Sequence, residues 1–148
     1  MNLTIIEDQN LEKNQLILKC FETNEQIQHI KSYVENLDTT IVGTLHAQKY
    51  FFHPNEIYYF ESVEKQTFLY SKEHVMKCSL RLYELEELLA YQCFIRISKS
   101  VLLNIMKIKS IHPLINRNLA LTLDNDENVI CSRRYVDSLK KTLERRQL

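Results

Sequence analysis

The chain has 148 residues, of which 45% are apolar and 26% are charged. This length suits one full domain with a short appendage, and the composition is that of a globular protein rather than a disordered or fibrous one. No apolar run approaches the ~20 residues that a membrane span requires, and the first residues lack the basic and apolar regions of a signal peptide. We therefore expect a cytoplasmic protein.

The sequence gives no indication of a metal or cofactor site. Four cysteines and five histidines are scattered singly, without a Cys-x-x-Cys pair or two histidines four residues apart. A single glycine is too few for a Gly-rich phosphate loop. Glu61, within an aromatic strand, is the one carboxylate in an unusual place, and a structural ion pair is favoured there over acid–base chemistry. We therefore expect no metal, no cofactor and no enzymatic activity.

The net charge of zero conceals a division of the chain into two parts. Residues 1–45 carry three basic and seven acidic side chains, a net charge of −4, and residues 46–148 carry the compensating +4. Such an asymmetry suggests that the two parts have different partners. We expect an acidic N-terminal segment over residues 1–45 and a basic domain over residues 46–148.

The acidic segment predicts two short strands, at residues 3–6 and 16–20, followed by a helix. Thr23 and Gln26 have the spacing of a capping box at the start of this helix. The helix has one apolar stripe, formed by Ile27, Ile30, Val34 and Leu37. Since an apolar stripe needs a sheet or a partner to cover it, we expect this one to contact a second copy of the chain or another protein.

The basic part is predicted to be mostly β (α+β), with antiparallel sheets and two short helices. The predicted strands, rich in aromatic and β-branched residues, are 40–45, 49–53, 57–63, 67–71, 74–78, 94–97, 106–111, 119–123 and 129–131. In residues 119–123 the three leucines are expected to face inward, with Ala120 and Thr122 outward. One helix, capped by Ser79, is expected to include residues 82–89, and another, capped by Ser132, starts at Arg133.

Basic residues concentrate where predicted strands meet turns. Arg96-Ile97-Ser98-Lys99-Ser100 combines two cations with two hydroxyls, which suits contacts to a nucleic-acid backbone and to a guanine edge. Arg133 and Arg134 open a helix, where free N–H groups and the helix dipole attract phosphate oxygens. The alternative is a surface whose charges only keep the protein soluble.

Residues 46–146 resemble the LytTR DNA-binding domain of bacterial transcription regulators. The matching stretches, in the family's order, are residues 57–62, 65–67, 80–88, 94–104, 108–111 and 132–136. The resemblance implies an elongated fold of packed antiparallel sheets that inserts loops, rather than a recognition helix, into successive major grooves. The LytTR domain often follows a phosphorylation receiver, but residues 1–45 are too short for one and predict the wrong order of elements.

The resemblance also implies roles for individual residues. Thr67, Lys99 and Arg134 match base-contacting positions, and Gln66 lies with Thr67 at the first DNA-facing turn. Lys65, Ser98, Ser100 and Arg133 would hold phosphates. Arginine and lysine suit guanine O6 and N7, whereas threonine can donate, accept or contact a thymine methyl.

Two functions remain open at this point. The first is a sequence-specific regulator that binds double-stranded DNA, with repeated half-sites read by a homodimer formed through the N-terminal segment. The second is an interaction module whose N-terminal helix docks a signalling or membrane protein, with the basic face incidental.

Overall fold

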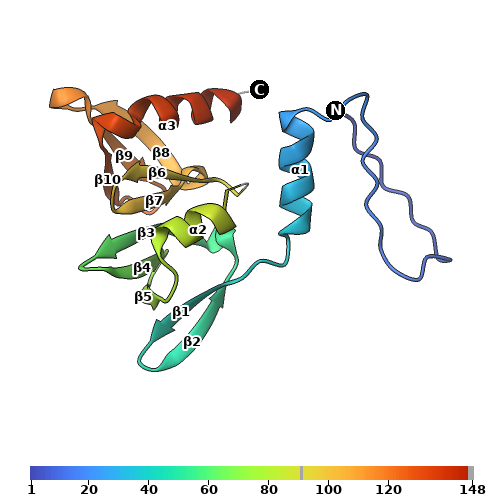
Figure 1. Cartoon of the computed structure of the whole chain (residues 1–148), viewed down its shortest axis with the longest axis horizontal. Coiled ribbons are helices and arrows are strands. Elements are labelled where there is room, and N and C mark those ends of the chain that lie inside the picture. The colour runs from blue at the N-terminus through green and yellow to red at the C-terminus, as the bar shows by residue number, and fades with distance from the viewer. Residues whose placement is uncertain (91, 147–148) are drawn as a thin grey trace.

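The computed structural model describes residues 1–90 and 92–146, over which the chain is mostly β, as predicted. A seven-stranded antiparallel sheet has the order β2-β1-β5-β4-β3-β7-β6, and a three-stranded sheet has the order β10-β9-β8 (Figure 1). The strands of the larger sheet are β1 (Ile41–Leu45), β2 (Gln48–Phe52), β3 (Ile57–Val63), β4 (Gln66–Ser71), β5 (Val75–Cys78), β6 (Phe94–Ser98) and β7 (Val101–Asn104). The smaller sheet contains β8 (Ile108–Pro113), β9 (Leu119–Leu123) and β10 (Asn128–Cys131).

Three α-helices accompany the sheets in the described residues: α1 (Glu25–Glu35), α2 (Leu82–Leu88) and α3 (Arg133–Arg146). Short 3₁₀ turns are η1 (Pro54–Glu56), η2 (Ile105–Lys107) and η3 (Ile115–Arg117). The three helices were predicted, but the predicted caps of α1 and α2 were wrong. Asn24, rather than Thr23, caps α1 by accepting a hydrogen bond from the Ile27 N–H at 3.0 Å. At α2 the cap is Arg81 rather than Ser79, and its N–H donates to Glu84 at 3.3 Å.

The predicted strands at residues 3–6 and 16–20 are absent, and this prediction was wrong for the single chain. Residues 1–23 contain no strand, and none of their side chains is buried. An isolated pair of strands is marginally stable in water unless a third strand or a helix covers it. These residues therefore have the composition of strands, but no sheet of the same chain pairs with them.

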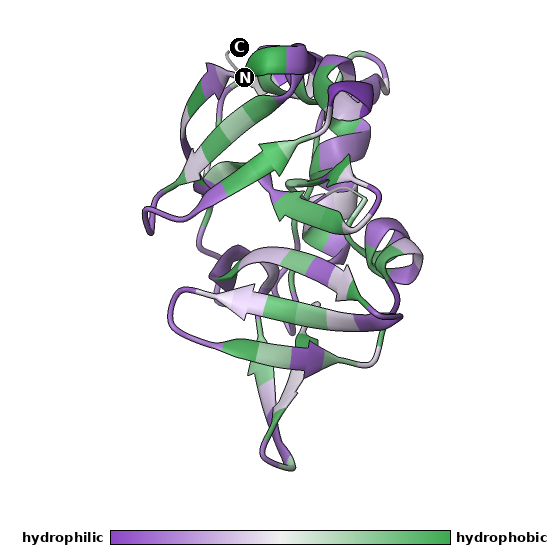
Figure 2. Ribbon diagram, turned by 90° about the vertical axis from the view of Figure 1, so that its left-hand side faces the viewer, coloured by the Kyte–Doolittle hydropathy of each residue, from purple (hydrophilic) through white to green (hydrophobic). Residues whose placement is uncertain are grey.

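Two apolar cores lie on opposite faces of the central strands β3 and β7. Leu102 of β7 belongs to the core under α2, with Phe60, Leu69 and Leu85, whereas the next residue, Leu103, belongs to the core under α3. Successive side chains of a strand point to opposite faces, so both faces of β7 are covered. The two cores join the sheets into one body that presents the strand ends and turns to solvent (Figure 2).

In β9 the three leucines are buried in the core under α3, as predicted, whereas Ala120 alternates with them and is not part of that core, although only 8% of its surface is exposed. Ala120 pairs with His112 of β8 and with Ile130 of β10, so strands flank its small side chain on both sides. The larger sheet begins at Ile41, whose side chain is part of the core under α2.

Candidate nucleic-acid interface

Three basic segments lie on one side of the body: the β3–β4 turn, the β6–β7 turn and the start of α3. Backbone hydrogen bonds tie them together. The Ser62 N–H of β3 donates to the Ser100 carbonyl at 2.8 Å, and the Ser132 N–H before α3 donates to the Ile97 carbonyl of β6 at 2.8 Å. Figure 1 shows these turns along the left-hand side, away from α1, and Figure 2 looks onto that side. The three segments therefore form one fixed surface.

The β3–β4 turn is a two-residue hairpin that presents Lys65. Glu64 and Lys65 both have positive φ, 49° and 67°, while Val63 pairs with Gln66 across the hairpin. Positive φ at both central positions is typical of a type I′ turn, whose twist matches that of the flanking strands. The side chains of Lys65 and Gln66 are exposed at the tip.

Thr67 is buried, with only 5% of its surface exposed. It lies two residues before Leu69 and thus on the same face of β4, toward the core under α2. On the neighbouring strands it pairs with Ser62 and Cys78. Its side chain is therefore not presented to a base at this surface, and the exposed neighbour in the same turn is Gln66.

The β6–β7 turn presents Lys99 between two serines. The Ser98 hydroxyl accepts a hydrogen bond from the Ser100 N–H at 3.2 Å, and the two hydroxyl oxygens are 3.4 Å apart. Lys99 is exposed at the tip. Lysine ammonium and serine hydroxyl groups are among those that contact phosphate oxygens in protein–DNA complexes, so this turn carries suitable residue types.

Arg96 lies beneath this turn rather than at its tip. Its Nε is 3.0 Å from Oε2 of Glu86 on α2, and its Nη1 donates to the Lys99 carbonyl at 2.6 Å. The Arg96 side chain is 20% exposed. These bonds engage the guanidinium within the protein, where it holds the turn that carries Lys99. The sequence gives no local sign of this pairing, because Glu86 lies ten residues before Arg96 on another element.

The start of α3 presents two exposed arginines, Arg133 and Arg134. The Arg133 N–H donates to Oδ1 of Asn118 at 2.9 Å. The side-chain acceptor at this helix start thus comes from Asn118 rather than from the predicted Ser132, whose backbone carbonyl accepts from the Tyr135 N–H. Arg117, exposed immediately before Asn118, adds a further cation beside α3.

The ion pairs of the described residues are Lys31–Glu35, Arg96–Glu86 and Lys109–Asp126. Among the basic side chains of this surface, only Arg96 is in one of these pairs. Lys107 is also engaged, because its ammonium lies 4.9 Å from the centre of the Tyr58 ring. Within the described residues, no carboxylate forms an ion pair with the side chains that remain for an anionic ligand: Lys65, Lys99, Arg117, Arg133 and Arg134.

Glu61 has a structural partner, although it is a hydroxyl rather than a cation. The Tyr70 hydroxyl donates to Oε2 of Glu61 at 2.8 Å, and the Tyr70 ring stacks on Tyr59 with 4.2 Å between centroids. Burial, and then the hydrogen bond to Glu61, raise the pKa of Tyr70 to about 12. This phenol therefore stays protonated at neutral pH, and the pair stabilises the strands behind the β3–β4 turn.

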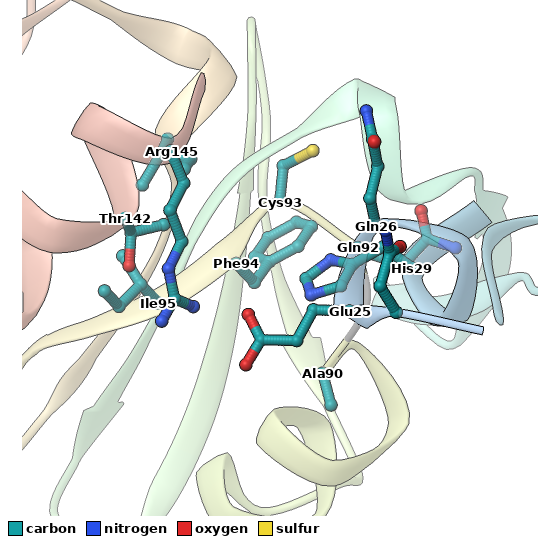
Figure 3. Close-up of a pocket in the computed structure, with 12 residues that line it drawn as sticks. Glu25, Gln26, His29, Ala90, Gln92, Cys93, Phe94, Ile95, Thr142 and Arg145 are labelled. Atoms are coloured by element: carbon teal, nitrogen blue, oxygen red, sulfur yellow. The ribbon is translucent and has the colours of Figure 1, made fainter. Parts of the chain in front are cut away.

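A hollow of about 860 Å³ lies at the other end of the body, between α1 and the sheets (Figure 3). Its lining includes Phe94 at the start of β6, Arg145 near the end of α3, and Glu25 of α1. The basic surface uses the opposite ends of the same two elements, the end of β6 and the start of α3. The hollow is thus separate from the basic surface.

Within the described residues, no cluster of three or more His, Cys, Asp or Glu side chains could hold a metal ion. No described helix is long and apolar enough to cross a membrane.

Comparison with known proteins identifies the family, because residues 47–144 match the LytTr DNA-binding domain. The chain belongs to the LytTR DNA-binding family. It is therefore a DNA-binding transcriptional regulator, and this family is not one of enzymes.

Individual relatives agree with this assignment. The LytTR chain is 30% identical over 145 residues to an HTH-type transcriptional regulator of Staphylococcus aureus strain bovine RF122, covering 97% of this chain and 98% of the relative. A regulator of strain MSSA476 is 32% identical over 122 residues, covering 81% of this chain and 82% of the relative. A solved LytTr DNA-binding domain from Bacillus cereus superposes with a TM-score of 0.67 at 27% identity, covering 71% of this chain and 96% of that domain.

The relatives' HTH label does not describe the arrangement of helices in this LytTR chain. A helix-turn-helix joins two helices by a short turn. In the described residues, five strands separate α1 from α2, and five more separate α2 from α3. The exposed cations lie in strand turns and at one helix start.

Proposed function

We propose that this protein reads a specific double-stranded DNA sequence by placing the β3–β4 turn, the β6–β7 turn and the start of α3 in the major groove. The observation that supports this most strongly is the set of exposed cations on three segments held together by backbone hydrogen bonds. Fixed geometry matters because base-edge contacts require directional hydrogen bonds, whereas a solubilising surface does not.

The side chains divide into two groups by their position. Lys99 and Arg134, at a turn tip and a helix start, are suited to guanine O6 and N7, and the exposed Gln66 is suited to adenine N6 and N7. Thr67 has no place in this proposal because it is buried. The groups that would hold phosphates are Lys65, Ser98, Ser100 and Arg133.

The test is fluorescence anisotropy on tiled duplexes from the region upstream of the coding sequence, at several salt concentrations. Arg134→Ala should cost about 1–3 kcal/mol on the specific site and relax the preference at one base pair. Lys65→Ala should weaken binding to all sequences and lower the salt slope by about 0.9, the value for one phosphate contact. Lys31→Ala, on α1 away from this surface, is the control for a general loss of charge. Unchanged specific binding by Arg134→Ala would contradict the proposed recognition.

We also propose that the regulator acts as a homodimer on repeated half-sites. Base-contacting segments from one domain can read only a short stretch of DNA, and two-fold proteins commonly read repeated sites. The exposed N-terminal segment supports a dimer contact through that segment.

The same exposure favours a second candidate, in which α1 and its apolar stripe dock a signalling or membrane protein. Deleting residues 1–38 would then abolish capture of that partner without changing binding to a single half-site. A dimer contact predicts instead that the deletion changes the oligomeric state.

A further inference from the structure

The N-terminal arm, residues 1–23, exposes more apolar surface than the chain can cover. Ile5 is 82% exposed and Ile17 is 74% exposed. Figure 1 shows the arm on the far side of α1 from the sheets. It reverses at Asp8, whose Oδ1 accepts from the Asn10 N–H at 2.9 Å and whose carbonyl accepts from the Leu11 N–H at 3.3 Å. The arm thus has the turn of a hairpin but no sheet.

Both faces of the arm would be apolar if its two halves were extended. Side chains alternate between faces in an extended chain. Leu16 and Leu18 would share one face, and Ile17 and Phe21 the other. A ribbon that is apolar on both faces must be covered on both to be stable.

The chain itself provides cover for one face only. In the apolar stripe of α1, Ile27, Ile30 and Val34 are half-buried, and Leu37 at its end is exposed. Among the described residues that line the hollow beside the body, none belongs to the stripe. The exposed part of this stripe therefore remains available for one face of the arm, and the other face requires a second molecule.

We infer that the arm pairs with the arm of a second copy of this chain, so that the extended segments form one intermolecular antiparallel sheet covered by the two α1 stripes. This deepens the proposed homodimer and rests on it. Unpaired strand edges are templates for pairing with another chain, and a two-fold axis makes such edges self-complementary.

The exposed area is sufficient for a stable dimer. The nine large apolar residues of the arm are Met1, Leu3, Ile5, Ile6, Leu11, Leu16, Ile17, Leu18 and Phe21. At on the order of 100 Å² of apolar surface for each, they offer roughly 900 Å² per chain, counted over both faces of the arm. A standard interface buries about 800 Å² per partner. The relative from strain bovine RF122 aligns over 97% of this chain, so a counterpart of most of the arm is present there.

The test measures the mass of the full chain in solution by size exclusion with light scattering. The parent protein should have twice the 17.7 kDa of one chain. Ile5→Glu and Ile17→Glu should convert it to a monomer. Ile115→Glu is the matched control, since Ile115 is 87% exposed in η3, outside the arm, and this variant should remain dimeric. Hydrogen exchange should show protected amides at residues 3–6 and 16–20 in the dimer, and free exchange there in the monomeric variants.

Three results would overturn the inference: a monomeric parent protein, arm variants that remain dimeric, or a dimer whose arm amides exchange freely. A monomer with protected arm amides would mean that the arm folds onto its own chain. These outcomes differ from those expected if the DNA proposal alone fails. If only the DNA proposal fails, the parent protein is still dimeric, but Arg134→Ala binds the specific site as well as the parent does.

Discussion

Replacing Arg96 with methionine separates a residue that positions the β6–β7 turn from one that contacts DNA. The substitution keeps an unbranched apolar stem but removes the hydrogen bonds to Glu86 and to the Lys99 carbonyl. If Arg96 only holds the turn, its loss should leave the number of phosphate contacts unchanged. If it binds phosphate, one contact should disappear.

The expected loss of affinity follows from the geometry. A hydrogen bond to a charged group contributes ~1.5–3 kcal/mol when buried, whereas an exposed ion pair contributes ~0–1 kcal/mol. Arg96 is 20% exposed and Glu86 is 52% exposed, which places their pair near the lower range. This pair affects the free energy of DNA binding only to the extent that it fixes the position of Lys99. We therefore expect binding to weaken by about 1 kcal/mol, roughly fivefold.

The assay is the salt dependence of anisotropy on the specific duplex, with Lys65→Met as the comparison. Arg96→Met should lower affinity at every salt concentration by a similar factor and leave the slope unchanged. Lys65→Met should lower the slope by about 0.9. A slope for Arg96→Met that falls as far as that of Lys65→Met would refute the positioning role.

Three further predictions concern stability. Asn104→Ala removes a buried amide that donates to the Ile57 carbonyl at 2.9 Å and accepts from the Met106 N–H at 3.0 Å. The free energy of unfolding, measured with urea, should therefore fall by about 2–4 kcal/mol. Gly43→Ala places a methyl group 3.0 Å from Cβ of Met76, so the free energy of unfolding in urea should fall by about 1 kcal/mol. An unchanged urea midpoint would mean that the strands shift to accommodate the methyl group. The hydrogen bond to Asp124, followed by burial, raises the pKa of Tyr58 from 10.0 to about 12. The folded state thus favours the neutral phenol. The resulting contribution to folding stability is complete below pH 10 and is lost as the pH rises through 12. The stability of Tyr58→Phe should therefore fall less steeply at alkaline pH than that of the parent protein.

The antiparallel hairpins could be predicted from the sequence because their strands are rich in aromatic and β-branched residues and are separated by short polar turns. β3 occupies residues 57–63 as expected, and β4 and β5 begin within one residue of the predicted positions. β7 was missed because both of its faces are buried, by α2 and by α3, so its side chains show no alternation. The predicted strand at 106–111 likewise merged the 3₁₀ turn η2 with β8.

The candidate site was only partly predictable for a related reason. Turn composition and charge are local properties, and they placed Lys65, Lys99 and Arg134 at exposed positions. The burial of Thr67 had a local signal too, since it shares a face with Leu69 two residues later. The pairing of Arg96 with Glu86 had none, because it joins β6 to a helix ten residues earlier in the chain.

The position of the hollow makes an arm-mediated dimer compatible with DNA binding. β6 and α3 both run across the body, and their ends at Ser98 and Arg133 form the basic surface while their ends at Phe94 and Arg145 face α1. A second copy joined at the arms would therefore attach on the side away from the exposed cations. Both basic surfaces would stay free, and the linkers between α1 and β1 would set the separation of the two half-sites. Lengthening the segment between Glu35 and Ile41 should then change the preferred spacing of half-sites without changing affinity for one half-site, and unchanged spacing would place the dimer contact within the LytTR domain itself.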